Sequence, residues 1–203
     1  MSHSNPSSGA PSPPRWADQF LRTLLGPSQA ETVSGDLLEE YRDSIHSTRG
    51  RSAADFWFVA QVARFAWHAV WIWSVAFATL QLGRDMLDWF MPPLDYTLRS
   101  AVTTYAAAAI FIALGFVRAW RTLSLRSTAL TALLAACVAA ILKVAGILLV
   151  LGIWPGTETQ NSGGLDEAIV LPWIVALPAT MIAIVAGLVG RTAAFVLRAR
   201  STR

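Results

Sequence analysis

The sequence predicts an all-α integral membrane protein in which four transmembrane helices follow a small cytoplasmic helical hairpin. Of its 203 residues, 54% are hydrophobic and only 14% are charged, whereas soluble domains average about 25% charged residues. Four apolar runs each hold at least the ~17 to 20 residues needed to cross a hydrocarbon core. The arginines gather in alternate segments between these runs, as in multi-pass membrane proteins.

The first 13 residues predict a disordered tail. They are rich in serine, proline and glycine and lack large apolar side chains. Such a segment cannot bury enough apolar surface to offset the entropy lost on ordering.

Residues 14–50 predict a cytoplasmic prefix domain made of two short helices. In the first, over residues 14–25, one apolar face comprises Trp16, Phe20, Leu21, Leu24 and Leu25. Gly26-Pro27 ends this helix. The second helix, over residues 28–47, opens on the capping-box pattern Ser28-x-x-Glu31. Its apolar stripe comprises Ala30, Val33, Leu37, Leu38, Tyr41 and Ile45.

Residues 51–203 predict the transmembrane domain. Gly50 is a natural stop for the second helix, and Ser52-x-x-Asp55 resembles a cap that opens the first membrane helix. The apolar spans run over about 57–82, 101–117, 129–154 and 168–190. Because backbone groups in lipid must be hydrogen-bonded within their own segment, these spans are expected to be helices.

The charge pattern predicts that both termini lie in the cytoplasm. The skew of 15 arginines to one lysine fits a bacterial genome, so the membrane is expected to be a bacterial inner membrane. Ten arginines fall on one side of a four-span arrangement: Arg49, Arg51, Arg64, Arg118, Arg121, Arg126, Arg191, Arg198, Arg200 and Arg203. The opposite loops hold two arginines and six of the thirteen acidic residues: Arg84, Arg99, Asp85, Asp88, Asp95, Glu158, Asp166 and Glu167. Cytoplasmic segments carry the excess of basic residues.

A dense group of carboxylates lies in the second helix of the prefix. Asp36, Glu39, Glu40 and Asp43 are spaced i, i+3, i+4 and i+7, so several share one helix face. The simplest interpretation is a solvated face that keeps an amphipathic helix soluble. A docking surface for a basic partner is the main alternative. A metal site needs ligands from several facing helices, and the first helix offers only Asp18.

Residues 14–62 carry a family resemblance. The matching features are Arg15-Trp16, Leu24-Leu25, the run Gly35-Asp36-Leu37 with Glu39-Glu40-Tyr41, the basic Arg49-Gly50-Arg51, and the aromatic Phe56-Trp57-Phe58 leading to Gln61. This segment resembles the permease prefix domain, which precedes the membrane domain of certain bacterial ABC transporter permeases. The resemblance implies a docking role, and the candidate docking residues are Gly35, Asp36, Glu39, Glu40, Tyr41 and Asp43.

The rest of the chain departs from that family. Such permeases are several times longer and carry a large extracytoplasmic domain between their first two core spans. Here the outer loops are under twenty residues long. No G-x-x-x-x-G-K-[ST] phosphate loop occurs, which argues against an ATPase. The sequence therefore predicts a prefix joined to a different, compact four-helix membrane unit.

Lys143 is the only lysine and lies inside the third span. It shares a helix face with Ala132, Ala136, Ala139 and Gly146, and small residues mark close helix contacts. We therefore expect its side chain to point into the bundle or a subunit interface, as a candidate intramembrane polar site. The alternative is a structural lysine that extends to the outer interface. With no acid assigned to a span core, its possible partners are Gln81, Thr103, Thr104 and Trp173.

A second small-residue row, Ala179, Ala183 and Gly187, predicts helix packing within the chain or between copies.

These features favour a non-enzymatic accessory or interaction protein in contact with the lipid bilayer. Its partner would be an ABC permease or a cytoplasmic protein. The sequence shows no catalytic, cofactor or metal motif, and its net charge of +3 is too small and dispersed for a nucleic-acid surface. Two alternatives stay open. One is a small transporter or channel that works as a homo-oligomer through Lys143, and the other is a membrane-anchored regulator that binds a cytoplasmic factor.

Overall fold

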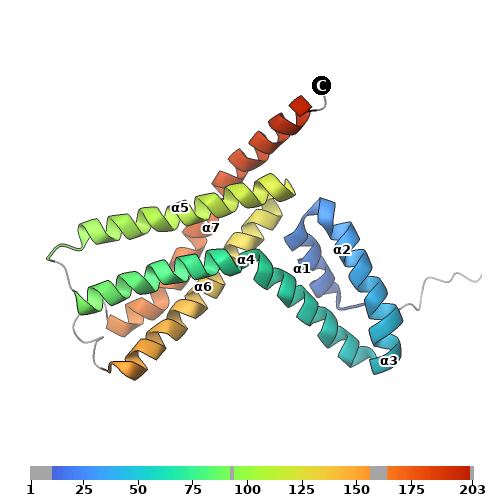
Figure 1. The fold of residues 1–203 in the computed structure, drawn as a ribbon, viewed down its shortest axis with the longest axis horizontal. Helices are drawn as coiled ribbons and strands as arrows, with labels where there is room; N and C mark the ends of the chain where they lie inside the picture. Colours follow the sequence, from blue (N-terminus) through green and yellow to red (C-terminus); the bar gives the residue numbers. More distant parts are fainter. Residues whose placement is uncertain (1–10, 92–93, 156–163, 202–203) are drawn as a thin grey trace, which may run out of the picture. The chain divides into compact units, whose positions relative to one another are not determined.

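The computed structural model describes residues 11–91, 94–155 and 164–201, which form helices and short connections without a strand (Figure 1). The elements are α1 (Arg15–Leu25), α2 (Pro27–Glu40), η1 (Tyr41–His46), α3 (Ser47–Arg49), α4 (Arg51–Phe90), α5 (Thr97–Thr122), α6 (Leu125–Ile153) and α7 (Gly164–Ser201). The predicted all-α class is confirmed. The chain divides into two compact units, Met1–His68 and Ala69–Arg203, with the division inside α4.

The N-terminal unit is a small helical cluster around one apolar core. Its buried side chains come from α1, the α2–η1 segment and the first turns of α4: Ala17, Leu21, Leu37, Tyr41, Ala54, Phe58 and Val62. Two residues of the predicted face, Phe20 and Leu25, pack against this core. Trp16, also on the predicted face, lies outside this core and is 61% exposed. The compact unit continues beyond residue 50, the predicted end of the prefix, because α4 completes its core.

A polar triad joins α1 to α2. The Arg22 guanidinium donates to Asp18 Oδ2 at 2.8 Å and to Ser34 Oγ at 2.7 Å. Ser34, which is buried, in turn donates to Asp18 Oδ1 at 2.6 Å. Asp18, the one acid of the first helix, is thus engaged in holding the two helices together.

Two glycines set the helix boundaries in this unit. Gly26, with φ of 81°, ends α1 and precedes Pro27, the first residue of α2. Left-handed φ values favour glycine, and proline suits the first helical position, so α2 begins one residue before the predicted Ser28 cap. Gly50, with φ of 79°, separates α3 from α4. Since α4 already begins at Arg51, Ser52 lies within the helix, and the predicted second cap is wrong.

The predicted tail falls mostly outside the described residues. Residues 1–10 are not described, and residues 11–14 have no regular secondary structure. Within that short segment, the Pro11 carbonyl accepts a hydrogen bond from Arg42 Nε at 3.0 Å.

Four helices are long and apolar enough to span a membrane, namely Arg51–Phe90, Thr97–Thr122, Leu125–Ile153 and Ile169–Arg200. The chain is therefore a multi-pass membrane protein, as predicted. The helices extend beyond the expected apolar spans, and α4 continues to Phe90 instead of ending near residue 82. Residues 83–90, which include Arg84, Asp85 and Asp88, are consequently helical and not part of a loop. Glu158 lies outside the described residues, as do the side chains of Asp166 and Glu167.

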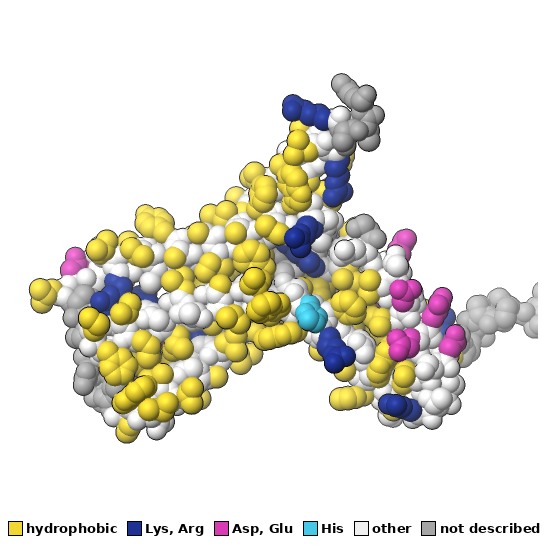
Figure 2. Space-filling model, viewed as in Figure 1, with side chains coloured by type: hydrophobic (Ala, Val, Ile, Leu, Met, Phe, Trp, Pro, Cys, Tyr) yellow, Lys and Arg dark blue, Asp and Glu magenta, His cyan; other side chains and the backbone are white. Residues whose placement is uncertain are grey.

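The membrane unit has a core of small side chains. Many of its buried residues are alanines: Ala78, Ala132, Ala135, Ala136, Ala139, Ala176, Ala179 and Ala183. Phe77 and Phe111 pack edge to face within this core, with ring centroids 5.1 Å apart. Large apolar side chains point outward instead, and Figure 2 shows hydrophobic side chains over much of the visible surface of this unit. That outward-facing apolar surface is what a hydrocarbon environment requires.

The predicted small-residue row of α7 packs within the chain. Ala179 and Ala183 are buried, and a methyl group at Gly187 would lie 3.1 Å from Thr128 Cγ2. Its unpredicted counterpart is Gly115 of α5, where an added methyl group would overlap the Ala183 carbonyl. A methyl group at Gly190 would similarly lie 2.6 Å from the Phe116 carbonyl oxygen. Glycine thus brings the backbones of α5 and α7 into direct contact, as is common between membrane helices.

We expect Gly115→Ala to lower the free energy of unfolding by roughly 1–3 kcal/mol, because the new methyl group must push a backbone carbonyl away. Gly83→Ala is the matched control, since a methyl group there meets no atom within 4 Å. The control should be neutral or stabilising by up to about 1 kcal/mol, from helix propensity alone. SDS-induced unfolding in mixed micelles measures both changes. Equal stability of the two variants would contradict the close contact between α5 and α7.

Candidate functional site

The acidic face, defined as Asp36, Glu39, Glu40 and Asp43, lies on the outer side of α2 and η1. All four side chains are exposed, and Figure 2 shows acidic side chains gathered on this unit. No hydrogen bond or ion pair joins them to another residue in the described part of the chain. Gly35 beside them is half-buried, and a methyl group there would meet open space. The structure thus places five of the six predicted docking residues along one accessible strip.

Tyr41, the sixth predicted docking residue, is fully buried. Its hydroxyl donates to Asp55 Oδ1 at 2.7 Å. Its ring packs edge to face on Phe58, with ring centroids 6.1 Å apart, and the centroid of the His46 ring lies 6.0 Å from that of Tyr41. Tyr41 begins η1, a turn of π-helix, and its contacts tie the acidic helix to the start of α4. Its place is in the core, so a partner cannot reach it without local unfolding.

Burial and the Asp55 carboxylate raise the pKa of Tyr41 from 10.0 to about 12. Burial is the larger cause, because ionisation would place a phenolate in the apolar core, and the adjacent carboxylate adds to the effect. A folded-state pKa above the unfolded value favours the neutral form. The resulting stabilisation is complete below pH 10 and is lost as the pH rises through 12.

The alkaline titration of Tyr41 tests this placement. Since the chain has three tyrosines, the tyrosinate absorbance of the wild type minus that of Tyr41→Phe isolates one ionisation. We expect its midpoint near pH 12, with loss of N-terminal helix content over the same range. A Tyr41 midpoint at pH 10 would contradict its burial against Asp55.

Lys143 forms an ion pair inside the membrane unit. Its side chain is 1% exposed, and Nζ lies 2.9 Å from Oδ2 of Asp85, which is 16% exposed. The distance is that of a close ion pair. The predicted small face is confirmed: Ala132, Ala136 and Ala139 are buried with Lys143, and a methyl group at Gly146 would lie 2.7 Å from Leu82 Cδ2.

The prediction that no acid inside a span could pair with Lys143 is wrong. It followed from ending the first span at residue 82, which assigned Asp85 to a loop. In the structure α4 continues to Phe90, so Asp85 lies one turn beyond Leu82 on a helix that packs against α6. The apolar residues Leu87, Trp89 and Phe90 were the signal for this longer helix, and Trp89 is indeed buried against Ile147.

A second charged group surrounds the same end of the bundle. Asp88 Oδ1 accepts from Arg99 at 2.7 Å, while its Oδ2 lies 3.4 Å from Arg84 Nε. Arg84 also donates from Nη2 to Ser100 Oγ at 3.1 Å. Charge-assisted N–H···O bonds are usually about 2.7–2.9 Å long. Asp88 therefore neutralises Arg99 well and Arg84 only weakly.

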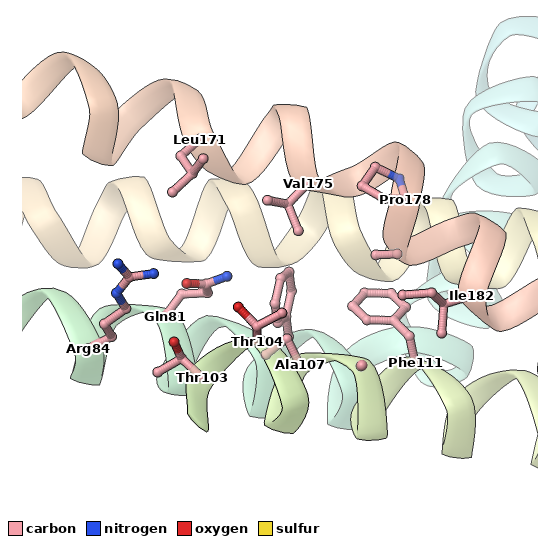
Figure 3. A pocket seen from close by; sticks show the side chains of 13 residues that line it. Gln81, Arg84, Thr103, Thr104, Ala107, Phe111, Leu171, Val175, Pro178 and Ile182 are labelled. Atoms are coloured by element: carbon pink, nitrogen blue, oxygen red, sulfur yellow. The ribbon is translucent and has the colours of Figure 1, made fainter. Parts of the chain in front are cut away.

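A cavity of about 330 Å³ lies between α4, α5 and α7 (Figure 3). Gln81, Arg84, Thr103 and Thr104 supply its polar wall. The rest is apolar: Phe77, Ala107, Ala108, Phe111, Leu171, Val175, Pro178, Ala179 and Ile182. Gln81, Thr103 and Thr104, which the sequence offers as possible partners of Lys143, thus line this cavity instead, whereas Lys143 is paired with Asp85. Trp173, the fourth, is 45% exposed.

Removing one member of the buried pair should destabilise the membrane unit. Lys143→Met leaves Asp85 without its partner, and breaking such a pair costs about 3–5 kcal/mol. The double variant Lys143→Met/Asp85→Leu should recover most of this loss, because apolar side chains can replace a buried pair. Arg22→Gln, which breaks a more exposed pair with Asp18, should cost less. SDS titration measures each variant, and a double variant no more stable than either single one would show that the pair is not the cause.

Comparison with models of known protein families, with curated proteins and with solved structures finds no match to this chain.

Proposed function

We propose that this chain is a non-enzymatic interaction protein of the bacterial inner membrane, whose N-terminal unit docks a basic protein surface. One observation carries the proposal. The apolar side of α2 and η1 is used in the core of its own unit, while the four carboxylates of the acidic face remain exposed and without partners among the described residues.

The spacing of the acidic face supports a partner over mere solvation. Asp36 and Glu40, like Glu39 and Asp43, are four residues apart. Like charges at this spacing destabilise a helix by about 0.2–0.5 kcal/mol per pair. No described cation offsets that cost. A basic partner would offset it, and a concentrated field of one sign also speeds encounter with such a partner.

The proposed partner is a component of an ABC-type permease system. The resemblance to the permease prefix domain supports this choice, and it covers residues 14–62. That segment contains all the buried core residues of the N-terminal unit, from Ala17 to Val62. The residues that resemble the prefix therefore include a complete apolar core, so this unit can present a surface of defined shape.

The proposed orientation places the acidic face in the cytoplasm. Arg118, Arg121 and Arg126 lie at the connection between α5 and α6, and Arg198 and Arg200 lie in the last turn of α7. The excess of arginine at these positions favours the cytoplasmic side. With four membrane helices, both termini then share that side.

The two other functional predictions are less well supported by the geometry. A regulator that holds a soluble cytoplasmic factor would use the same acidic face and differs only in its partner. A small oligomeric transporter would use Lys143, yet Asp85 pairs with that lysine within the chain, which favours a structural role. The interaction role is therefore the preferred proposal.

Affinity purification of the intact protein from its native membranes tests docking. We expect the Asp36→Asn/Glu39→Gln/Glu40→Gln variant to recover less of an ABC permease component than the wild type. An exposed ion pair contributes about 0.2–1 kcal/mol, so losing three should weaken binding roughly 3- to 100-fold. Raising the ionic strength should have a similar effect, because salt screens exposed charges.

The matched control is Glu31→Gln, an exposed acid of α2 outside the acidic face. Equal recovery of the permease component by the wild type and the triple variant would rule out docking through these carboxylates. A soluble factor in place of a permease component would favour the regulator. A reporter fused after Arg203 tests orientation, and activity confined to the extracytoplasmic side would overturn the proposed topology.

A further inference from the structure

We infer that the cavity between α4, α5 and α7 binds a single-chain anionic amphiphile, with its head at Arg84 and its acyl chain between the helices. This inference concerns only the membrane unit and does not depend on docking by the N-terminal unit. Its basis is the shape, chemistry and charge of the cavity wall.

The polar and apolar parts of the wall are separated in space. In Figure 3, Arg84, Gln81 and Thr103 stand at one end, while Phe111 and Ile182 stand at the other. Arg84 lies six residues before the end of α4, so the polar end is near a helix terminus and the apolar end is deeper in the bundle. A ligand that matches this wall has one polar end and one apolar body.

The apolar part of the cavity has an identifiable cause. Its wall includes Ala107, Ala108 and Ala179, whose methyl groups leave space between the helices. Pro178 adds to it, because proline cannot donate to the Ile174 carbonyl and disturbs the regular helix there. The volume of about 330 Å³ is at the lower end of the ~300–1,000 Å³ typical of ligand pockets. That size favours one acyl chain over a two-chain lipid.

The charge at the polar end favours an anionic head. Arg84 is the only charged side chain among the described residues of the cavity wall. Its hydrogen bonds to Asp88 and Ser100 use Nε and Nη2, so the Nη1 donors have no partner within the described part of the chain. Asp88 lies closer to Arg99, at 2.7 Å, than to Arg84, at 3.4 Å, so its carboxylate leaves Arg84 free to bind a further acceptor through Nη1. The Gln81 amide, also without a partner among described residues, supplies a further donor.

A carboxylate and a phosphate monoester would both satisfy these donors, since each accepts bidentate contacts from a guanidinium. The head is therefore assigned by its charge, and the two chemical sources are separated by experiment. Uncharged amphiphiles of the same chain length would bring no charged acceptor to the Nη1 donors of Arg84 and should bind less well.

Photolabelling in lipid nanodiscs tests the inference. The probes are three diazirine-bearing chains of equal length: a fatty acid, a lysophosphatidate and a fatty alcohol. We expect the two acids, or one of them, to label the cavity-lining segments of α5 and α7, with peptide mapping by mass spectrometry. Arg84→Gln should reduce that labelling about tenfold, as expected for losing a charge-assisted contact. Stronger labelling by the fatty acid would identify the head group as a carboxylate, and stronger labelling by the lysophosphatidate would identify it as a phosphate.

Ala107→Phe provides an independent arm by filling the cavity, and Ala109→Phe is its control because Ala109 is exposed on the same helix. We expect only Ala107→Phe to abolish labelling at the cavity, with both variants monodisperse on size-exclusion chromatography. Two results would overturn the inference. One is labelling spread evenly over the lipid-facing surface and unchanged by Ala107→Phe. The other is fatty alcohol labelling equal to that of both acids, which would remove the role of Arg84.

Discussion

The direct backbone contact between α5 and α7 at Gly115 is the constraint on which the membrane unit depends. Membrane helices gain little from hiding apolar surface from each other, because lipid is equally apolar. Close approach of backbones must supply the attraction instead. Gly115, Gly187 and Gly190 allow that approach, and the alanines of α6 and α7 continue it through the core. The large side chains are left to face lipid.

The same tight packing explains where charge is tolerated. The alanine face of α6 leaves room beside Lys143 for a long side chain, and α4 carries Asp85 to it. One turn further along α4, Asp88 is shared unequally by two arginines. This end of the bundle therefore holds two kinds of charged group. The Lys143–Asp85 pair is neutralised in the interior, whereas Arg84 has Nη1 donors left to face the cavity. Asp85 can pair with Lys143, and Arg84 can line the cavity, because α4 continues as a helix beyond residue 82.

The sequence predicted the helical class, the four membrane helices and the inward direction of Lys143, because hydrophobic length and small-residue periodicity are local signals. It did not predict the Lys143–Asp85 pair. Hydropathy locates the apolar part of a helix, whereas Asp85 lies on the polar extension of α4 beyond it. Tyr41 shows a second limit. The sequence placed it both on the apolar stripe of the second helix and among the docking residues, and the structure confirms the stripe, because Tyr41 lies in the core. The close contact at Gly115 was not predicted, because the sequence does not show which residue of another helix faces a given glycine.

Tyr41 also shows how an exposed acidic face and a buried core can share one short segment. Its hydroxyl bond to Asp55 and its contact with Phe58 fix the helix on which the acidic face lies. The carboxylates can then be presented as a set without an internal partner, because the buried side of the helix supplies the stability that their mutual repulsion removes. The well-packed opposite side of α2 and η1 thus makes this row of like charges compatible with a defined fold.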